Sequence, residues 1–575
     1  MHFSRILQLT LTVLISLLIL TSCNQPQSEN ADMVLINGNI ATINDAMPHA
    51  EAIAIKGDTI QSVGSNSDIN TLIGKNTRVI DLKGKFVMPG FIESHAHFLG
   101  LGNSKMILDL NSAANWDEIV AIVAEAAENA KPGDWIVGRG WHQEKWDPVP
   151  EPNVEGYPIH NMLSSATPFN PVLLFHASGH AIFANKEAMN LAGIDTSTSD
   201  PVGGRIVRDS LNKKAIGVFE ENAEDLIYKE YQKFLDNKSA AEKKRKMHEK
   251  IRLAAIECAE NGITSFHDAG ETFDVIDFLK EEVDSGFLKV RLYVMIGESN
   301  KNLKKRISDY KIIGYGNDFL TVRSIKAYID GALGSHGAWM LEDYSDLPGN
   351  KGDNVTSLAS LRKTAEIAIN NGFQMCTHAI GDRGNREILN IYESTFKKHP
   401  DKHDLRWRIE HAQHLSNKDI KRFAELGVIA AMQGIHCTSD ATFVEKRLGS
   451  DRAEQGAYVW RKLIDSGVII CNGTDAPVEP VSTINNFYAT VTRKLPDGSA
   501  FYPEQKMTRL EALKSYTING AYASFQEDKV GSIEKGKLAD IVVLSNDLLK
   551  VPDEQIKKTK IVLTIVGGEV VYGEK

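Results

Sequence analysis

Eight short apolar segments recur along the chain, and each has the pattern of a β-strand followed by a turn signal and a helical pattern. The segments end near His97, His267, Ile296, Lys326, His378, His411, Gln433 and Asp475. The gap from His411 to Asp475 holds two strand-helix units of roughly 31 residues, and residues 427–433 supply the extra strand within it. Strands and helices that alternate at this spacing predict an α/β fold, a (β/α)8 barrel of the TIM type.

Five of the eight strand ends carry residues that can bind a metal ion. The first ends in His95-Ala96-His97, where positions i and i+2 point to the same face, so both imidazoles can reach one ion. The other candidates at strand ends are Lys326, His378, His411 and Asp475. Because all of them would lie at the carboxyl ends of parallel strands, where barrel enzymes build their active sites, we expect one shared metal centre.

Each candidate ligand taken alone also has an ordinary structural explanation. A His-x-His pair often occurs by accident, and His411 alone is equally well a core histidine. Asp475 precedes Ala-Pro and can be a turn or N-cap residue, while an isolated Lys326 would extend its amine to solvent. The joint placement at predicted strand ends is what favours a metal site.

These motifs resemble the amidohydrolase superfamily, and within it the amidohydrolase-3 branch of YtcJ-like and AepA-like proteins. The resemblance covers nearly everything after the leader, and it includes these further motifs: Gly179-His180 with Asn185, Gly203-Gly204, Gly217-Val-Phe-Glu220, Asp330-Gly-Ala-Leu-Gly-Ser335, and the run from Gly531 to Asp540. Two positions depart from the usual pattern: Glu93 replaces a common Asp, and His336 replaces a common Arg. Neither change removes a candidate ligand, although His336 can alter what the pocket binds.

The donor types indicate a catalytic rather than a closed structural metal site. Imidazole nitrogens with a carboxylate suit zinc, while manganese, iron or cobalt use the same donors; we expect one or two divalent ions per chain, with zinc as the first choice. The resemblance implies that Lys326 takes up carbon dioxide to form a carbamate whose two oxygens bridge the ions. A water shared by two ions can have a pKa near 7. Asp475 is expected to accept its proton and to protonate the departing nitrogen.

The expected activity is therefore hydrolysis of a non-peptide carbon–nitrogen bond, in an amide, formamide or related small molecule. Two alternatives remain open from the sequence. The same barrel can deaminate its substrate or open a cyclic imide, as relatives in the wider superfamily do. The third hypothesis is a non-catalytic lipoprotein that binds a ligand in an inactive barrel, although such a protein has no chemical need for Lys326 or Asp475.

The domain organisation follows from the flanks of the barrel, which spans residues 89–525. Short alternating strands lie in residues 33–88 and again in residues 526–575, and the resemblance implies that both ends form one small composite β-sandwich. The distance from the first strand to the second leaves a large insertion at about residues 100–255. We expect this insertion to cover the mouth of the barrel and to shape the substrate pocket.

Several polar residues outside the metal set are expected near the mouth as substrate contacts. They are His180, His176, Trp141, Arg139, His336, Gln433 and His436. His267 ends the second strand and is equally well a hydrogen-bond donor behind the ligands or a pocket residue. No motif in the insertion identifies the substrate.

Composition and the amino-terminal segment indicate an anchored enzyme. The 575 residues carry a net charge of -10 without a basic run, which argues against a nucleic-acid partner. The apolar stretch within residues 1–22 has the length of a signal peptide, and Leu-Thr-Ser-Cys23 resembles a bacterial lipoprotein signal. We expect lipid on Cys23, a polar linker at residues 23–32, and a membrane anchor that faces the periplasm. A homodimer is the default expectation for assembly.

Overall fold

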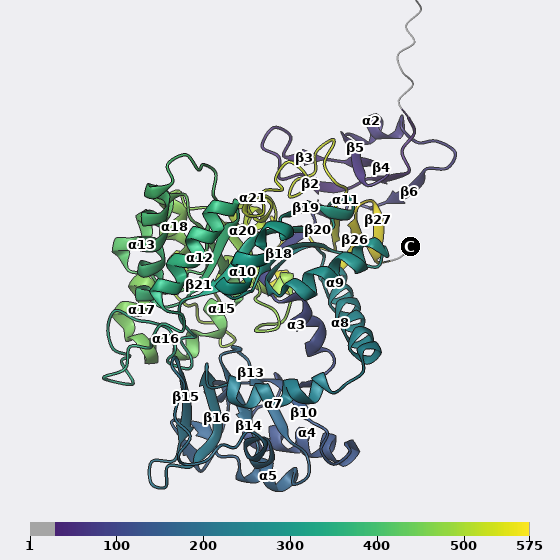
Figure 1. Cartoon of the computed structure of the whole chain (residues 1–575). Coiled ribbons are helices and arrows are strands. Elements are labelled where there is room, and N and C mark those ends of the chain that lie inside the picture. The colour runs from purple at the N-terminus through teal and green to yellow at the C-terminus, as the bar shows by residue number, and fades with distance from the viewer. Residues whose placement is uncertain (1–28, 574–575) are drawn as a thin grey trace, which may run out of the picture.

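The computed structural model describes residues 29–573 and divides them into a barrel, an insertion and a β-sandwich. In Figure 1 the sandwich lies at the upper right, the barrel at the centre and left, and the insertion below the barrel. The expected leader and Cys23 lie outside the described residues. Among residues 29–573, no helix combines the length and apolar character that a membrane crossing requires.

The barrel consists of eight parallel strands, as predicted. In spatial and chain order they are β8 (Phe91–Ala96), β17 (Ile263–Glu271), β18 (Arg291–Ile296), β20 (Leu320–Tyr328), β21 (Gln374–Ala379), β22 (Arg408–His411), β23 (Ile429–Gln433) and β24 (Ile470–Gly473). The loop after β24 joins β8 through hydrogen bonds from Asp475 N to His95 O (2.8 Å) and from His97 N to Ala476 O (2.8 Å). These bonds link the last strand to the first and nearly close the barrel.

Two strands run further than the sequence indicated. β17 continues four residues past His267, to Glu271, and bulges against both neighbouring strands, which allows the extra residues to remain paired. β20 continues past Lys326 to Tyr328, where it still pairs with β21. A short antiparallel strand, β19 (Ile312–Gly314), pairs with the first part of β20, with Ile312 opposite Val322.

Helices surround the barrel and connect its strands. Their bounds are α3 (Phe98–Ser104), α8 (Ala240–Glu260), α9 (Phe273–Asp284), α10 (Asn300–Arg306), α12 (Leu358–Asn371), α13 (Asp382–Lys398), α14 (Asn417–Leu426), α15 (Gly434–Ser439), α16 (Ala441–Leu448), α17 (Ser450–Gly456), α18 (Trp460–Asp465), α19 (Thr483–Thr492), α20 (Arg509–Ser515) and α21 (Ile518–Ala523). Helix α12 illustrates the local signals: the Ser357 hydroxyl caps its start, and Gly372 ends it at a φ of 67°. Its apolar face packs into the core of the barrel.

The insertion is a small α/β unit with a hydrophobic core of its own. Its six-stranded sheet has the order β15 (Gly204–Arg208), β16 (Ala215–Glu221), β14 (Ala181–Ala184), β13 (Val172–His176), β10 (Ile136–Trp141) and β9 (Leu108–Asp109). Helices α4 (Trp116–Asn129), α5 (Asn161–Ala166), α6 (Lys186–Leu191) and α7 (Asp225–Asp236) complete it. Helix α8 then returns the chain to the barrel; its charged first half is largely exposed, while Ile251, Ala254 and Cys258 pack into the barrel core.

Both ends of the chain form the β-sandwich, as the resemblance implied. One sheet has the order β5 (Thr59–Gly64), β4 (Ala52–Lys56), β1 (Met33–Ile36), β6 (Arg78–Asp81). The other has the order β27 (Glu569–Tyr572), β26 (Ile561–Val566), β25 (Ile541–Leu544), β7 (Phe86–Pro89), β2 (Asn39–Ala41), β3 (His49–Ala50). Because β7 pairs with β25, with Val87 opposite Val543, the sandwich cannot form before both ends of the chain are present.

Candidate metal centre

All six predicted ligands converge at the carboxyl end of the barrel. Nε2 of His97 lies 3.3 Å from Oδ1 of Asp475, and Nε2 of His95 lies 3.7 Å from the same oxygen. Nζ of Lys326 lies 3.2 Å from Nε2 of His95. The rings of His378 and His411 have centroids 4.6 Å apart, and the His411 ring lies 4.7 Å from that of His95. His97 alone is half-buried, while the other five are buried.

The backbone is held in an unusual conformation at two of these residues. His411 has a φ of 71° and Asp475 a φ of 59°, which is the left-handed region that side chains other than glycine rarely adopt. Such strain persists where the surrounding structure imposes it, and it is common at functional sites. For Asp475, the hydrogen bond from its own N–H to His95 O supplies part of that constraint.

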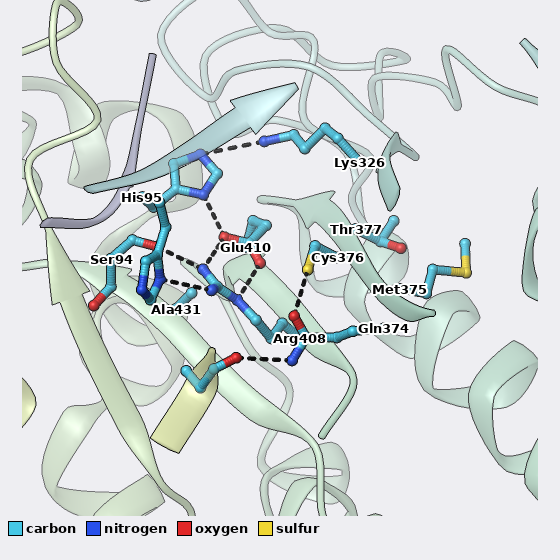
Figure 2. A network of polar contacts seen from close by, with 12 residues as sticks. Ser94, His95, Lys326, Gln374, Met375, Cys376, Thr377, Arg408, Glu410 and Ala431 are labelled. Atoms are coloured by element: carbon cyan, nitrogen blue, oxygen red, sulfur yellow. Dashed lines mark hydrogen bonds and ion pairs between the residues drawn. The ribbon is translucent and has the colours of Figure 1, made fainter. Parts of the chain in front are cut away.

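A buried ion pair orients His95, the first candidate ligand (Figure 2). Nδ1 of His95 bonds to a Glu410 carboxylate oxygen, and Arg408 bonds to both oxygens of Glu410 at 2.8 Å. Burial alone raises the pKa of Glu410, but Arg408 and His95 hold it well below its usual range. Because an ionised Glu410 accepts the Nδ1 proton, the Nε2 lone pair of His95 faces Lys326 and Asp475. Burial also lowers the pKa of His95 to about 4, so this ring is neutral at neutral pH, as a metal ligand must be.

His411 is oriented in the same way by a different partner. Its Nδ1 donates to Oε1 of Gln433 at 2.7 Å, and the Gln433 amide nitrogen donates to Ala431 O at 3.1 Å. This arrangement leaves Nε2 of His411 directed at the cluster, and burial lowers the pKa of the ring well below its usual value. Gln433, expected as a substrate contact, therefore lies behind a ligand and not on the cavity wall.

The polar atoms at the centre of the cluster lack protein partners, which is what a metal site requires. Oδ1 of Asp475 and Nε2 of His378 are buried and form no hydrogen bond with any described residue. Nitrogen and oxygen atoms of His95, His97 and Asp475 lie within 4.8 Å of one another, as do those of His411, His436 and Asp475. The two groups share Asp475, and their imidazole and carboxylate donors fit a divalent ion. His436, expected as a substrate contact, thus belongs to a candidate ligand group.

Lys326 is buried next to these groups, with 5 % of its surface exposed. Burial lowers the pKa of its amine, although Glu410 and Asp475 favour the charged form. Its Nζ also lies 4.8 Å from the centroid of the Tyr328 ring. Lys326 therefore does not extend to solvent, in contrast to an ordinary surface lysine.

The cavity beside the cluster has two arms that meet at His180, His378, His411 and Asp475. The larger arm has a volume of about 590 Å³ and lies between the insertion and the barrel, with Arg139, Glu221 and Glu224 in its wall. The smaller arm, about 50 Å³, is lined by Leu333, Phe443 and His436, among others. A substrate whose reacting bond lies at the cluster can thus extend one substituent into each arm.

Of the residues expected to contact substrate, His180 and His436 line the cavity, as does Arg139, while the others lie apart from it. Trp141 is fully buried in the insertion, where its indole N–H donates to Leu174 O at 2.8 Å. His176 bonds to Gln143 and Ser178 behind the wall, and His336 pairs with Asp346 at 3.2 Å. The walls of the two arms therefore contain fewer of the expected substrate contacts than their positions at predicted loop ends indicated.

Two functional pairs were missed by the sequence reasoning. The Glu221 carboxylate lies 2.9 Å from Nδ1 of His180 and holds that ring over the cavity, and its side chain fits only because Gly331 and Gly337 lack a Cβ. The other pair is Arg408 with Glu410. The sequence does contain a signal for this second pair. Arg408 and Glu410 are two opposite charges two residues apart inside an otherwise apolar barrel strand, and such charges must be paired when they are buried.

Comparisons with known proteins agree with this geometry. The sequence profile of the amidohydrolase family matches residues 78–572. Protein LONG AFTER FAR-RED 3 of Arabidopsis thaliana is 31% identical over 96% of this chain and 94% of its own length. The N-substituted formamide deformylase of Arthrobacter pascens is 26% identical over 94% of this chain and 98% of its own.

A solved structure extends the similarity to the whole architecture. An uncharacterised metal-dependent hydrolase from Pyrococcus furiosus superposes with a TM-score of 0.68 at 26% identity, over 90% of this chain and all of the other. The profile match spans the barrel, the insertion between its first two strands, and the part of the sandwich from β6 onward. The chain therefore belongs to the amidohydrolase family of metal-dependent hydrolases.

Proposed function

We propose that this protein hydrolyses a non-peptide carbon–nitrogen bond in a small molecule, an amide, formamide or related compound. The observation that carries the proposal is the position of Asp475: its buried Oδ1 has no partner among residues 29–573 other than the imidazoles 3.3 and 3.7 Å away. A carboxylate in this position can exchange a proton with groups in the cavity. The formamide deformylase relative acts on N-substituted formamides, as its name states, and this supports the same reaction class here.

The histidines would hold the metal, with zinc as the expected ion and one or two ions per chain. His95, His97 and Asp475 would form one site, and His378 and His411 would contribute to a second. Lys326, as a carbamate, would offer two further oxygen donors to the ions, and its burial beside His95 supports this role. When bound, the ion would supply Lewis acidity, which polarises a carbonyl and makes water more acidic.

The remaining chemistry belongs to side chains of this chain. Burial raises the pKa of Asp475, but the imidazoles of His97, His411 and His95 hold it well below its usual range, so the carboxylate is ionised and can accept a proton from the attacking water. The same atom would return the proton to the departing nitrogen. His180, fixed by Glu221, stands over the cavity next to His378 and would orient the substrate there.

An Asp475→Asn variant tests this proposal. We expect activity on the true substrate to fall by roughly 10²–10⁴-fold, because the amide cannot accept the proton, while the fold persists. A matched Asp277→Asn variant removes a surface carboxylate that bonds to Tyr310, and it should keep full activity. Wild-type turnover in the Asp475→Asn variant would contradict the proposed role. Product analysis separates an amine and an acid from the ammonia of a deaminase or the ring-opened acid of an imide hydrolase.

We also propose that the protein is tethered to a bacterial membrane through lipid on Cys23 and faces the periplasm. The Leu-Thr-Ser-Cys23 sequence after an apolar stretch supports this localisation. Wild-type protein labelled with radioactive palmitate in cells should fractionate with membranes, whereas Cys23→Ser should remain unlabelled. Equal labelling of both forms would contradict the anchor.

A further inference from the structure

Arg139 places a positive charge in the larger arm of the cavity without a carboxylate to neutralise it. The residue lies on β10 of the insertion, and its side chain reaches the loop that carries Asp475. Nε donates to Pro477 O at 3.2 Å, and Nη2 donates to Ala177 O at 2.8 Å. Neither acceptor carries a full charge.

These two bonds leave most of the guanidinium free. The group has five N–H donors in a planar fork, and Nη1 has no hydrogen-bond partner among the described residues. Across residues 29–573, no Asp or Glu forms an ion pair with Arg139, and Asp475 and Glu224 act on its charge only through space. Since the residue lines the cavity, the free side of the fork is accessible from it.

The acidic residues that face this arm do not compensate the charge by contact. Glu221 pairs with His180, Asp475 belongs to the candidate metal centre, and Glu271 is near Asp268. Asp330 accepts hydrogen bonds from three backbone N–H groups. Glu224 lines the same arm, but burial raises its pKa well above the usual value, which reduces the fraction of negative charge that it can offer. Burial lowers the pKa of Arg139 to about 10, although Asp475 and Glu224 favour its charged form, so this side chain is charged at neutral pH.

A glycine lies beside the guanidinium in the wall of the larger arm. Gly179 has a φ of 75°, which disfavours any other residue, and an added Cβ would be in ordinary van der Waals contact with Nη2 of Arg139, at 3.7 Å. A planar oxyanion is the ligand that best matches an arginine fork, because two parallel N–H···O bonds can form.

We propose that Arg139 binds a carboxylate on the substrate, so that the preferred substrates are small amides or formamides that carry a free carboxylate in the larger arm. This inference rests on the proposed function for the identity of the reacting bond. The Arg139 fork would fix the distance between the carboxylate and the scissile bond, because Pro477, which holds its Nε, follows Asp475 by two residues. Arg139 is then a specificity residue and not only a clamp between the insertion and the barrel.

The test compares formamides that differ only in charge. N-formylglycine, 3-formamidopropanoate and 4-formamidobutanoate are each paired with the corresponding primary amide, and zinc-loaded full-length protein is used throughout. Both kcat/KM and the calorimetric dissociation constant are measured for wild type, Arg139→Gln and Arg139→Lys. Arg208→Gln is the matched control, because Arg208 also donates to backbone carbonyls of the insertion but lies outside the cavity.

We expect wild type to prefer the acid of at least one pair by about 10- to 100-fold, as a charge-assisted bidentate bond does. Arg139→Gln should bring the ratio of acid to amide close to one, because only the acid loses a charge-assisted contact, while any fall in the amide measures the loss of the bonds to Pro477 and Ala177. Arg139→Lys should keep part of the preference, and Arg208→Gln should match wild type. Equal binding of acid and amide by wild type, or an equal loss for both in Arg139→Gln, would overturn the inference.

The two readouts separate this inference from the proposed function. If the acids bind in an Arg139-dependent manner but no compound is hydrolysed, the carboxylate site stands and hydrolysis of formamides is wrong. If amides and acids are hydrolysed equally, the reaction class stands and the carboxylate site is wrong. Absence of both turnover and differential binding overturns both for this substrate series.

Discussion

At the scale of single residues, the site depends on groups that never touch the substrate cavity. Glu410 accepts the Nδ1 proton of His95, and Arg408 holds Glu410 in place while donating to Ser94 O at 2.6 Å. Both charged side chains are completely buried. Such partners fix the tautomer of a ligand and raise its basicity, so their loss affects the metal before it affects the substrate.

The Glu410→Gln variant should therefore bind zinc about 10- to 100-fold more weakly than wild type. It also leaves Arg408 buried without its counter-charge, which should lower the free energy of unfolding by about 3 kcal/mol. Competition with a chelator measures the first effect and urea titration the second. Glu393→Gln breaks a partly exposed pair with Arg422 and should change stability by less than about 1 kcal/mol. Unchanged zinc affinity in Glu410→Gln would exclude His95 as a ligand oriented by this pair.

At the scale of elements, the junction between β24 and β8 assembles the ligands. Glu93 on β8 accepts hydrogen bonds from the Thr474 N–H (2.8 Å) and the Thr474 hydroxyl (2.9 Å), so the Glu that replaces the common Asp ties β8 to the loop before Asp475. Gly473, the last residue of β24, packs directly against this contact. The two strands can approach closely because that position lacks a side chain.

A Gly473→Ala substitution tests this junction. Its Cβ would lie 2.1 Å from a Glu93 carboxylate oxygen and 2.7 Å from the backbone nitrogen of His95, so both strands must shift. We expect a loss of about 1–3 kcal/mol in the free energy of unfolding, together with a loss of metal affinity. Thermal unfolding with and without zinc measures the loss of metal affinity, because zinc should raise the unfolding temperature of the variant less than that of wild type. Equal stabilisation by zinc in both proteins would mean that the junction does not position the ligands.

At the scale of the whole molecule, the insertion is fixed over the barrel by charged contacts at the cavity rim. Glu144 of the insertion accepts from Arg447 at 2.8 Å and from Lys446 at 2.9 Å, both on α16 of the barrel. Arg447 also pairs with Asp346 and donates to Gly334 O at 2.8 Å. Since Phe443 of the smaller arm lies on the same helix, these contacts couple the docking of the insertion to the shape of the cavity.

Glu144→Gln should loosen this docking without unfolding either unit, because the insertion has its own core. We expect faster amide hydrogen exchange at residues 142–146 and 441–448, and a fall in kcat/KM of about tenfold or more, since small displacements at a site are costly. Glu151→Gln, at an exposed position of the insertion, serves as the control. Unaltered exchange and activity in Glu144→Gln would show that other contacts fix the insertion.

Sequence patterns were sufficient for the barrel and for the clustering of its candidate ligands, because both depend on local periodicity. Strand-helix alternation predicted all eight strands, and the i, i+2 rule predicted that His95 and His97 share a face. The family resemblance likewise anticipated the composite sandwich that β7 and β25 form. The ends of β17 and β20 were less well predicted, because bulges and pairing with neighbours decide where a strand stops.

Only the tertiary structure decided what surrounds those ligands. The sequence by itself determined the element order and the residue types that can bind a metal, since these follow from hydrophobic spacing and donor chemistry. It could not place Gln433 behind His411, Glu410 behind His95, or Trp141 in the core of the insertion. These positions depend on strand register, on side-chain direction and on contacts between segments hundreds of residues apart, which no local pattern encodes.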